Sequence, residues 1–289
     1  MGYVMTPKAL DFYAAVDFSK RSVDVLNQVL SRFPLLVNGL LINGYYYTHV
    51  NSYRENALEV LKRHELKIII DPGTYSVWRK NQQKPFSDFL PILIENIAWT
   101  HQHLIKNCPD RIIFGILLPD HHMNPYDTIQ LASQSYSILT GTCKISKDKL
   151  IGVCHGSLPE IPTNKFVEEY VSQHLHGIVD CCRFYIQKLN LRKIGLGACS
   201  AFKIKADPLN LFQRRAEVLS EFTKTLGNRI HIHALGVGTK DLVNKIRDFI
   251  DSFDTQTYLT TTKVRKLHGQ GRTEAAVKYI LDLLSSSCQ

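Results

Sequence analysis

Long apolar runs are absent from this 289-residue sequence, and none approaches the roughly 18 residues that a membrane-spanning helix needs. The N-terminal segment carries charges at Lys8, Asp11 and Asp17, so it lacks the uninterrupted apolar stretch of a signal peptide. We therefore expect a cytoplasmic protein without a membrane anchor.

Cysteine pairs with the spacing of a metal or disulfide motif are also lacking. The seven cysteines include no Cys-x-x-Cys pair and no regular spacing, which argues against a disulfide framework or a zinc knuckle. Internal repeats, low-complexity segments and long linkers are missing too. Residues 1–289 are therefore predicted to form a single domain in a reducing compartment.

Acidic residues are outnumbered by basic ones, and the formal net charge is +9. One interpretation is a solvated basic surface with no specific partner. The other is a polyanionic partner, because lysine and arginine neutralise phosphates and release counterions. Both interpretations stay open at this point.

What the sequence does contain is an alternation of short apolar runs and longer amphipathic segments. The runs are apolar throughout, which is typical of parallel strands that helices cover. At this length the alternation favours an α/β fold, a single-domain TIM (β/α)8 barrel. The expected strands are 36–42, 67–71, 112–118, 150–155, 193–198, 230–237 and 252–258, with an eighth near 13–18. The expected helices are 18–32, 54–64, 86–106, 126–141, 164–188, 208–226, 239–250 and 272–285.

Polar residues and glycines recur where the apolar runs end. Asp71, Asp120 and Asp254 each stand at or beside such a run. Because the carboxyl ends of barrel strands converge on one face, we expect these carboxylates to meet there. Asp71 then suits proton transfer, and Asp254 suits attack on a sugar carbon. A plainer interpretation is local: Asp71 before Pro72 and Gly73 also suits a turn, and Asp254 an ion pair.

His231 and His233 stand two residues apart in an expected strand, so their side chains share one face. Such a pair suits a metal ion, and a metal-dependent TIM-barrel hydrolase is therefore an alternative. The turn after this strand contains Gly236 and Gly238. It suits an anion or, as the plainer interpretation, a helix that Thr239 caps.

Basic residues gather after Asp254, namely Lys263, Arg265, Lys266 and Arg272. They form either a solvated loop or the contacts to a nucleic-acid backbone.

Six short motifs together resemble the tRNA-guanine transglycosylase family, including its DNA-modifying members. They are Asp71-Pro-Gly-Thr-Tyr75, Pro119-Asp120, Gly152-Val-Cys-His155-Gly156, Ile194-Gly195-Leu196-Gly197, His233-Ala-Leu-Gly236-Val-Gly238 and Phe253-Asp254. The resemblance implies a TIM barrel that exchanges guanine in a polynucleotide for a 7-deazaguanine.

The resemblance also implies a role for each matched residue. Asp254 is the nucleophile and Asp71 the general acid/base, and no cofactor or metal is needed. Pro72 and His155 depart from the family's Ser and Gln, so contacts to the base are expected to differ. The expected base-binding residues are Tyr75, Asp120, His155, Gly156, Gly195, Leu196 and Gly197.

The family's tRNA-acting members follow the nucleophile with cysteines that bind structural zinc. Here no cysteine lies between Cys199 and Cys288. This departure favours the DNA-guanine transglycosylase branch, with DNA and a 7-deazaguanine base as substrates. A tRNA substrate, a non-catalytic nucleic-acid-binding subunit and a homodimer remain alternatives.

Overall fold

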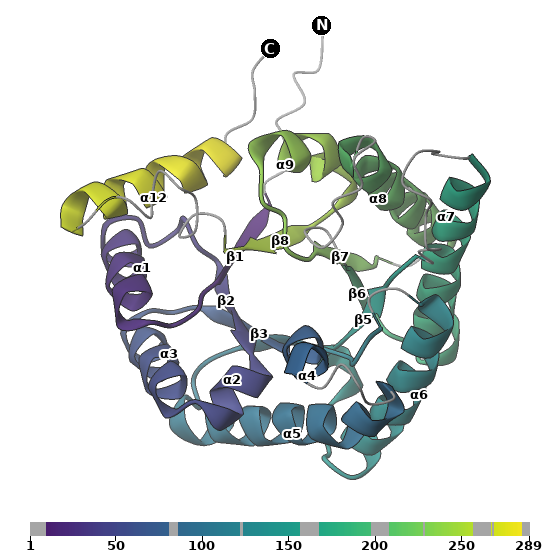
Figure 1. The fold of residues 1–289 in the computed structure, drawn as a ribbon, viewed down its shortest axis with the longest axis horizontal. Coiled ribbons are helices and arrows are strands. Elements are labelled where there is room, and N and C mark those ends of the chain that lie inside the picture. Colours follow the sequence, from purple (N-terminus) through teal and green to yellow (C-terminus); the bar gives the residue numbers. More distant parts are fainter. Residues whose placement is uncertain are drawn as a thin grey trace, which may run out of the picture.

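A computed structural model of the protein describes residues 10–80, 86–121, 124–156, 168–197, 208–227, 229–256, 267 and 269–284. Its centre is a closed parallel barrel in which the strands follow one another in chain order, so the predicted TIM barrel is confirmed (Figure 1). The strands are β1 (Asp11–Ala15), β2 (Gly39–Asn43), β3 (Lys67–Asp71), β4 (Ile113–Leu117), β5 (Leu150–Cys154), β6 (Lys193–Leu196), β7 (His231–Ala234) and β8 (Ser252–Thr255).

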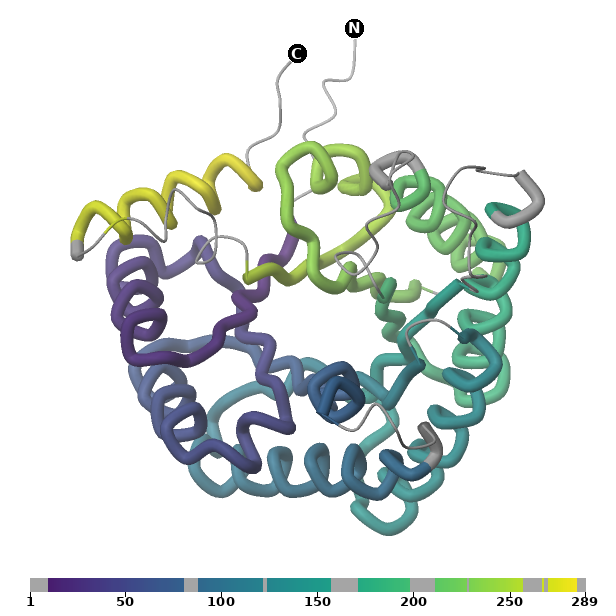
Figure 2. The backbone as a smooth tube through the Cα atoms, in the orientation of Figure 1, coloured from purple at the N-terminus to yellow at the C-terminus, as the bar shows by residue number. Residues whose placement is uncertain are grey.

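Most helices form a ring outside the strands, while α4 lies inside that ring near β3 (Figure 2). The α-helices are α1 (Lys20–Arg32), α2 (Gly44–His49), α3 (Asn51–Arg63), α4 (Thr74–Lys80), α5 (Leu90–Asn107), α6 (Pro125–Gly141), α7 (Glu168–Arg183), α8 (Pro208–Thr225), α9 (Lys240–Ile246) and α12 (Gly269–Leu284). The short helices are η1 (Phe86–Phe89), η2 (Lys147–Lys149), η3 (Phe184–Lys188, a π-helix) and η4 (Arg247–Phe249).

Apolar side chains fill the barrel on both sides of its wall. The larger core lies between the strands and the surrounding helices. A smaller core inside the barrel contains Tyr13, Ile69 and Ile151. The Tyr13 ring occupies the space that a side chain at position 39 would fill. A Cβ on Gly39 would lie 2.5 Å from Tyr13 Cε1. Burial on both faces explains why the strands are apolar throughout rather than alternating.

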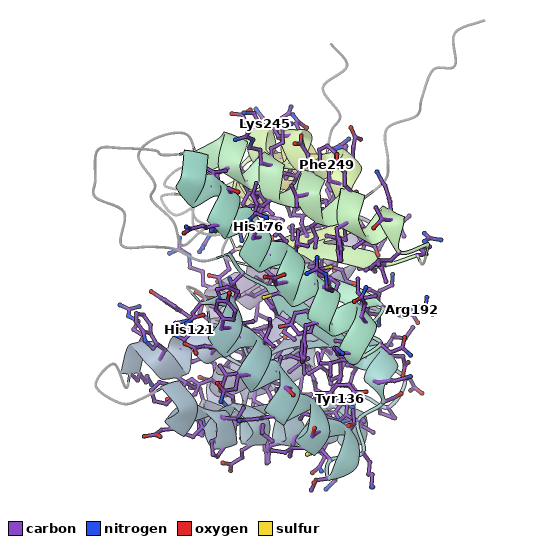
Figure 3. All side chains as sticks on the ribbon, turned by 90° about the vertical axis from the view of Figure 1, so that its right-hand side faces the viewer. His121, Tyr136, His176, Arg192, Lys245 and Phe249 are labelled. Atoms are coloured by element: carbon purple, nitrogen blue, oxygen red, sulfur yellow. The ribbon has the colours of Figure 1, made fainter. Side chains whose placement is uncertain are left out.

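The carboxyl ends of the strands lie together at one end of the barrel. His121 follows β4 and Arg192 precedes β6, and Figure 3 shows them at opposite ends of the molecule. The end beside His121 is where the carboxyl ends of the strands open. Active sites of such barrels are built at this end.

Among the residues that the structure describes, no helix combines the length and the apolar composition required to cross a bilayer.

Candidate active site

The carboxyl group of Asp71 lies within electrostatic reach of two others from distant parts of the sequence. Asp71 ends β3, Asp120 follows β4, and Asp254 lies in β8. Burial, together with repulsion from Asp120 and from Asp254, raises the pKa of Asp71 to about 7, although a hydrogen bond from the Gly73 amide opposes the shift. The Gly73 nitrogen lies 2.8 Å from Asp71 Oδ1. Asp71 therefore keeps a proton near neutral pH and can donate or accept one there.

The carboxylate of Asp254 is buried and held on one of its two oxygens. Its Oδ1 accepts hydrogen bonds from the Gly236 amide at 3.1 Å and from His233 Nε2 at 3.2 Å. No described residue donates a hydrogen bond to Oδ2. With the side chain only 5% exposed, this arrangement fixes the carboxylate plane and leaves one oxygen to react.

Asp120 is paired with a buried histidine. His155 Nε2 lies 2.5 Å from Asp120 Oδ2, and the His155 side chain is 3% exposed. The imidazole lies against Gly197, where a Cβ would be 2.2 Å from its Cε1. The predicted residues Asp120, His155 and Gly197 are thus brought together. His155 directs its Nε2 at Asp120, so that nitrogen is already engaged within the protein.

The backbone groups at the end of β6, which were expected to contact the base, are also hydrogen-bonded within the protein. Leu196 O accepts from the Leu235 amide, and the Gly197 amide donates to Cys154 O. Arg215 Nη2 donates to Gly197 O at 2.6 Å. Parallel strand pairing and Arg215 therefore already engage these three groups, and the role of β6 in lining a base pocket stays a prediction.

Two further predicted glycines differ in what surrounds them. A Cβ at Gly195 would meet side chains from inside the barrel, such as Val153, at ordinary contact distance, 3.5 Å or more. A Cβ at Gly156 would lie 2.3 Å from His174 Nδ1, so any larger residue here would have to displace the His174 ring. Gly156 therefore serves the packing of the β5 end against α7.

Tyr75 presents an exposed aromatic surface beside Asp71. It lies in the first turn of α4 and is 57% exposed. Its ring centroid is 5.9 Å from that of Trp78, at an interplanar angle of 37°. An aromatic ring exposed to this extent suits stacking on a planar ligand.

Of the four residues expected to bind phosphates, the structure describes only Arg272. Lys263, Arg265 and Lys266 lie outside the described residues. Arg272 lies in α12 and is 6% exposed. A residue buried to this extent offers little surface to a phosphate, and the expected role of Arg272 in binding a nucleic-acid backbone stays a prediction.

His231 and His233 point to the same side of the sheet, as predicted, and they share one partner. Ser252 Oγ lies 2.7 Å from His231 Nε2 and 2.8 Å from His233 Nδ1. Within the described ranges, no three His, Cys, Asp or Glu side chains are arranged to hold a metal ion. The sequence analysis did not single out Ser252. The sequence feature that could have identified Ser252 is its position two residues before Asp254, because residues i and i+2 of a strand share one face.

No protein-family model matches the sequence, and none of the curated proteins matches it either.

Proposed function

We propose that this protein is a base-exchange glycosyltransferase that replaces guanine in DNA with a 7-deazaguanine. The supporting observation is the pair of unlike carboxyl groups at the barrel mouth. Asp71 has a pKa near neutrality, and Asp254 is fixed by two donors on one oxygen. Two carboxyl groups in contrasting surroundings suit one acid/base role and one nucleophilic role.

In the first step Asp254 Oδ2 attacks C1′ of the target nucleoside. The bond from C1′ to the guanine N9 breaks, its electron pair stays on the base, and protonated Asp71 supplies the proton. A glycosyl ester on Asp254 results. In the second step Asp71 removes a proton from the incoming deazaguanine, whose nitrogen attacks C1′ and releases Asp254. Neither step requires a cofactor.

The surrounding residues suit a planar base with polar edges. Tyr75 stacks on the base, and Asp120, oriented by His155, accepts hydrogen bonds from its N–H edge. The base must leave its helical stack to reach the barrel mouth, which costs a few kcal/mol. The absence of the zinc-binding cysteines favours DNA over tRNA. Cys154, Cys181 and Cys182 are free and buried, which agrees with a cytoplasmic location.

A base-exchange assay tests this proposal. The full-length protein is incubated with radiolabelled guanine and, in parallel, with duplex DNA, single-stranded DNA and tRNA. We expect label to enter DNA, and a denaturation-resistant adduct to form between protein and polymer. Asp254→Asn should abolish both. Asp248→Asn, which changes an exposed carboxylate on η4, is the matched control and should leave both intact.

Label that enters no polymer, or an adduct that persists in Asp254→Asn, would overturn the proposal. Label that enters only tRNA would keep the chemistry and reassign the polymer.

A further inference from the structure

A continuous set of polar side chains runs through the interior of the barrel to Asp254. His231 and His233 on β7 both contact Ser252 on β8, and His233 also contacts Asp254. The register makes this possible, because His233 is the direct neighbour of Ser252 in the sheet. We refer to His231, Ser252 and His233 as the histidine–serine network.

Two members of the network are isolated from solvent, while His231 is half-buried. His233 and Ser252 are each 0% exposed. The Tyr13 ring stands edge-on to His233, with centroids 5.5 Å apart, and Phe114 packs against His231. Buried polar groups of this kind cost stability unless they are hydrogen-bonded, and apolar residues would fill the same space more cheaply. A role beyond packing is therefore expected.

The direction of the hydrogen bonds follows from the carboxylate. Asp254 in its charged form only accepts, so His233 Nε2 must carry the proton. A neutral His233 then accepts at Nδ1 from the Ser252 hydroxyl, and Ser252 in turn accepts from His231 Nε2. Burial, together with His233 and Lys193, lowers the pKa of His231 to about 4, although Asp251 and Asp11 oppose the shift, so His231 is neutral as this order requires.

We propose that the histidine–serine network positions the nucleophile: it fixes the Nε2–H tautomer of His233, which holds Asp254 Oδ1 and leaves Oδ2 facing the sugar. His233 and Ser252 are thus positioning residues that touch no substrate. This inference rests on the proposed function for the role of Asp254, while the hydrogen-bond order itself does not.

The tautomer is measured without any activity. Nitrogen-15 spectra of the full-length protein with labelled histidine report which ring nitrogen carries the proton, and His233→Gln identifies the His233 signals by their loss. We expect the Nε2–H form for His233 at neutral pH. In Ser252→Ala the acceptor site at Nδ1 loses its donor, so the Nδ1 signal should shift, while Nε2 keeps its proton because Asp254 still accepts from it. A wild-type His233 in the Nδ1–H form would overturn the inference.

Kinetics test the positioning role. His233→Leu removes the donor to Asp254, and we expect kcat for base exchange to fall about 10–100-fold with an unchanged KM for the base. His233→Gln keeps a donor near the position of Nε2 and should recover much of that loss. Ser135→Ala, which removes a buried hydroxyl bonded only within α6, is the matched control and should leave kcat unchanged.

Equal kcat in His233→Leu and wild type, both folded by circular dichroism, would overturn the inference and leave the proposed function standing. A wild-type protein with the expected tautomer but no exchange activity would instead overturn the proposed function.

Discussion

Asp71 serves the local fold and the candidate site at once. It accepts the Gly73 amide in a tight turn, as the plainer interpretation of its sequence expects, and Gly73 has a φ of 79°, which favours glycine. The same carboxyl group lies near Asp120 and Asp254. The local and the functional interpretation are therefore compatible, because a turn at a strand end also orients a side chain into the barrel mouth.

The raised pKa of Asp71 makes a prediction about stability. Its folded pKa of about 7 lies above its ordinary value of 3.8, so folding binds a proton between these pH values. Wild-type stability from this group is therefore full below about pH 4 and declines as the pH rises towards about 7. Asp71→Asn removes this dependence but keeps an acceptor for Gly73. We expect it to stabilise the protein by about 1–3 kcal/mol at about pH 8 and to have little effect at about pH 4.

Urea unfolding of both proteins at the two pH values measures this difference. An equal effect of the substitution at both would show that Asp71 is ordinarily acidic in the folded protein.

Gly197 makes a second prediction at the level of one residue. An alanine Cβ there would overlap the His155 ring, so Gly197→Ala should displace His155 from Asp120. We expect a loss of about 1–3 kcal/mol in stability and at least a tenfold higher KM for the base. Gly195→Ala is the matched control, since its Cβ meets neighbours only at 3.5 Å or more. Equal KM values in the two variants would contradict a role for the His155–Asp120 pair in binding the base.

The short helices are the elements that the sequence pattern missed. α2 and α4 follow β2 and β3 directly and were not among the expected helices. With six and seven residues, they are too short to show a helical period. Their positions are set by contacts instead: Asn43 caps α2 through the Tyr46 amide, and its side-chain nitrogen lies 3.4 Å from Ser76 Oγ in α4.

At the N-terminus of α9, by contrast, the sequence alone was enough to suggest the capping residue. Thr239 was predicted to cap this helix, and its Oγ1 does accept from the Leu242 amide at 3.3 Å. Thr239→Ala should destabilise the protein by about 1 kcal/mol, because one amide of the first turn loses its acceptor. Thr239→Ser keeps the oxygen and should cost much less. Thermal unfolding of the two variants measures this, and equal losses would mean that the hydroxyl does not act as a cap.

The charge of the whole molecule bears on its partner. The net charge of +9 favours association with a polyanion. If the partner is DNA, affinity should fall at least tenfold between about 50 and about 200 mM salt, because even about two neutralised phosphates produce that slope. Fluorescence anisotropy with a short labelled DNA, with a neutral backbone analogue as the control, measures it. An affinity independent of salt would argue that the positive charge is only a solvated surface.

Closure of the barrel belongs to the same scale, and β1 achieves it. This strand was expected near residues 13–18 but lies at Asp11–Ala15, paired with β2 on one side and β8 on the other. Its short sequence carries a weak signal of its own. Pairing with β8 sets the Tyr13 side chain inside the barrel against His233. Without that closure neither Asp254 nor the histidine–serine network has its surroundings.

The sequence alone determined the order of strands and helices and the rim positions of Asp71, Asp120 and Asp254, since continuous apolar runs and strand ends are local features. Tertiary structure alone decided the pairing of His155 with Asp120, 35 residues apart, and the contact of both histidines of β7 with Ser252. These depend on the register between strands and on the packing of side chains inside a closed barrel. Neither is encoded in the spacing of residues along one segment, because each arises from the fit of several segments at once.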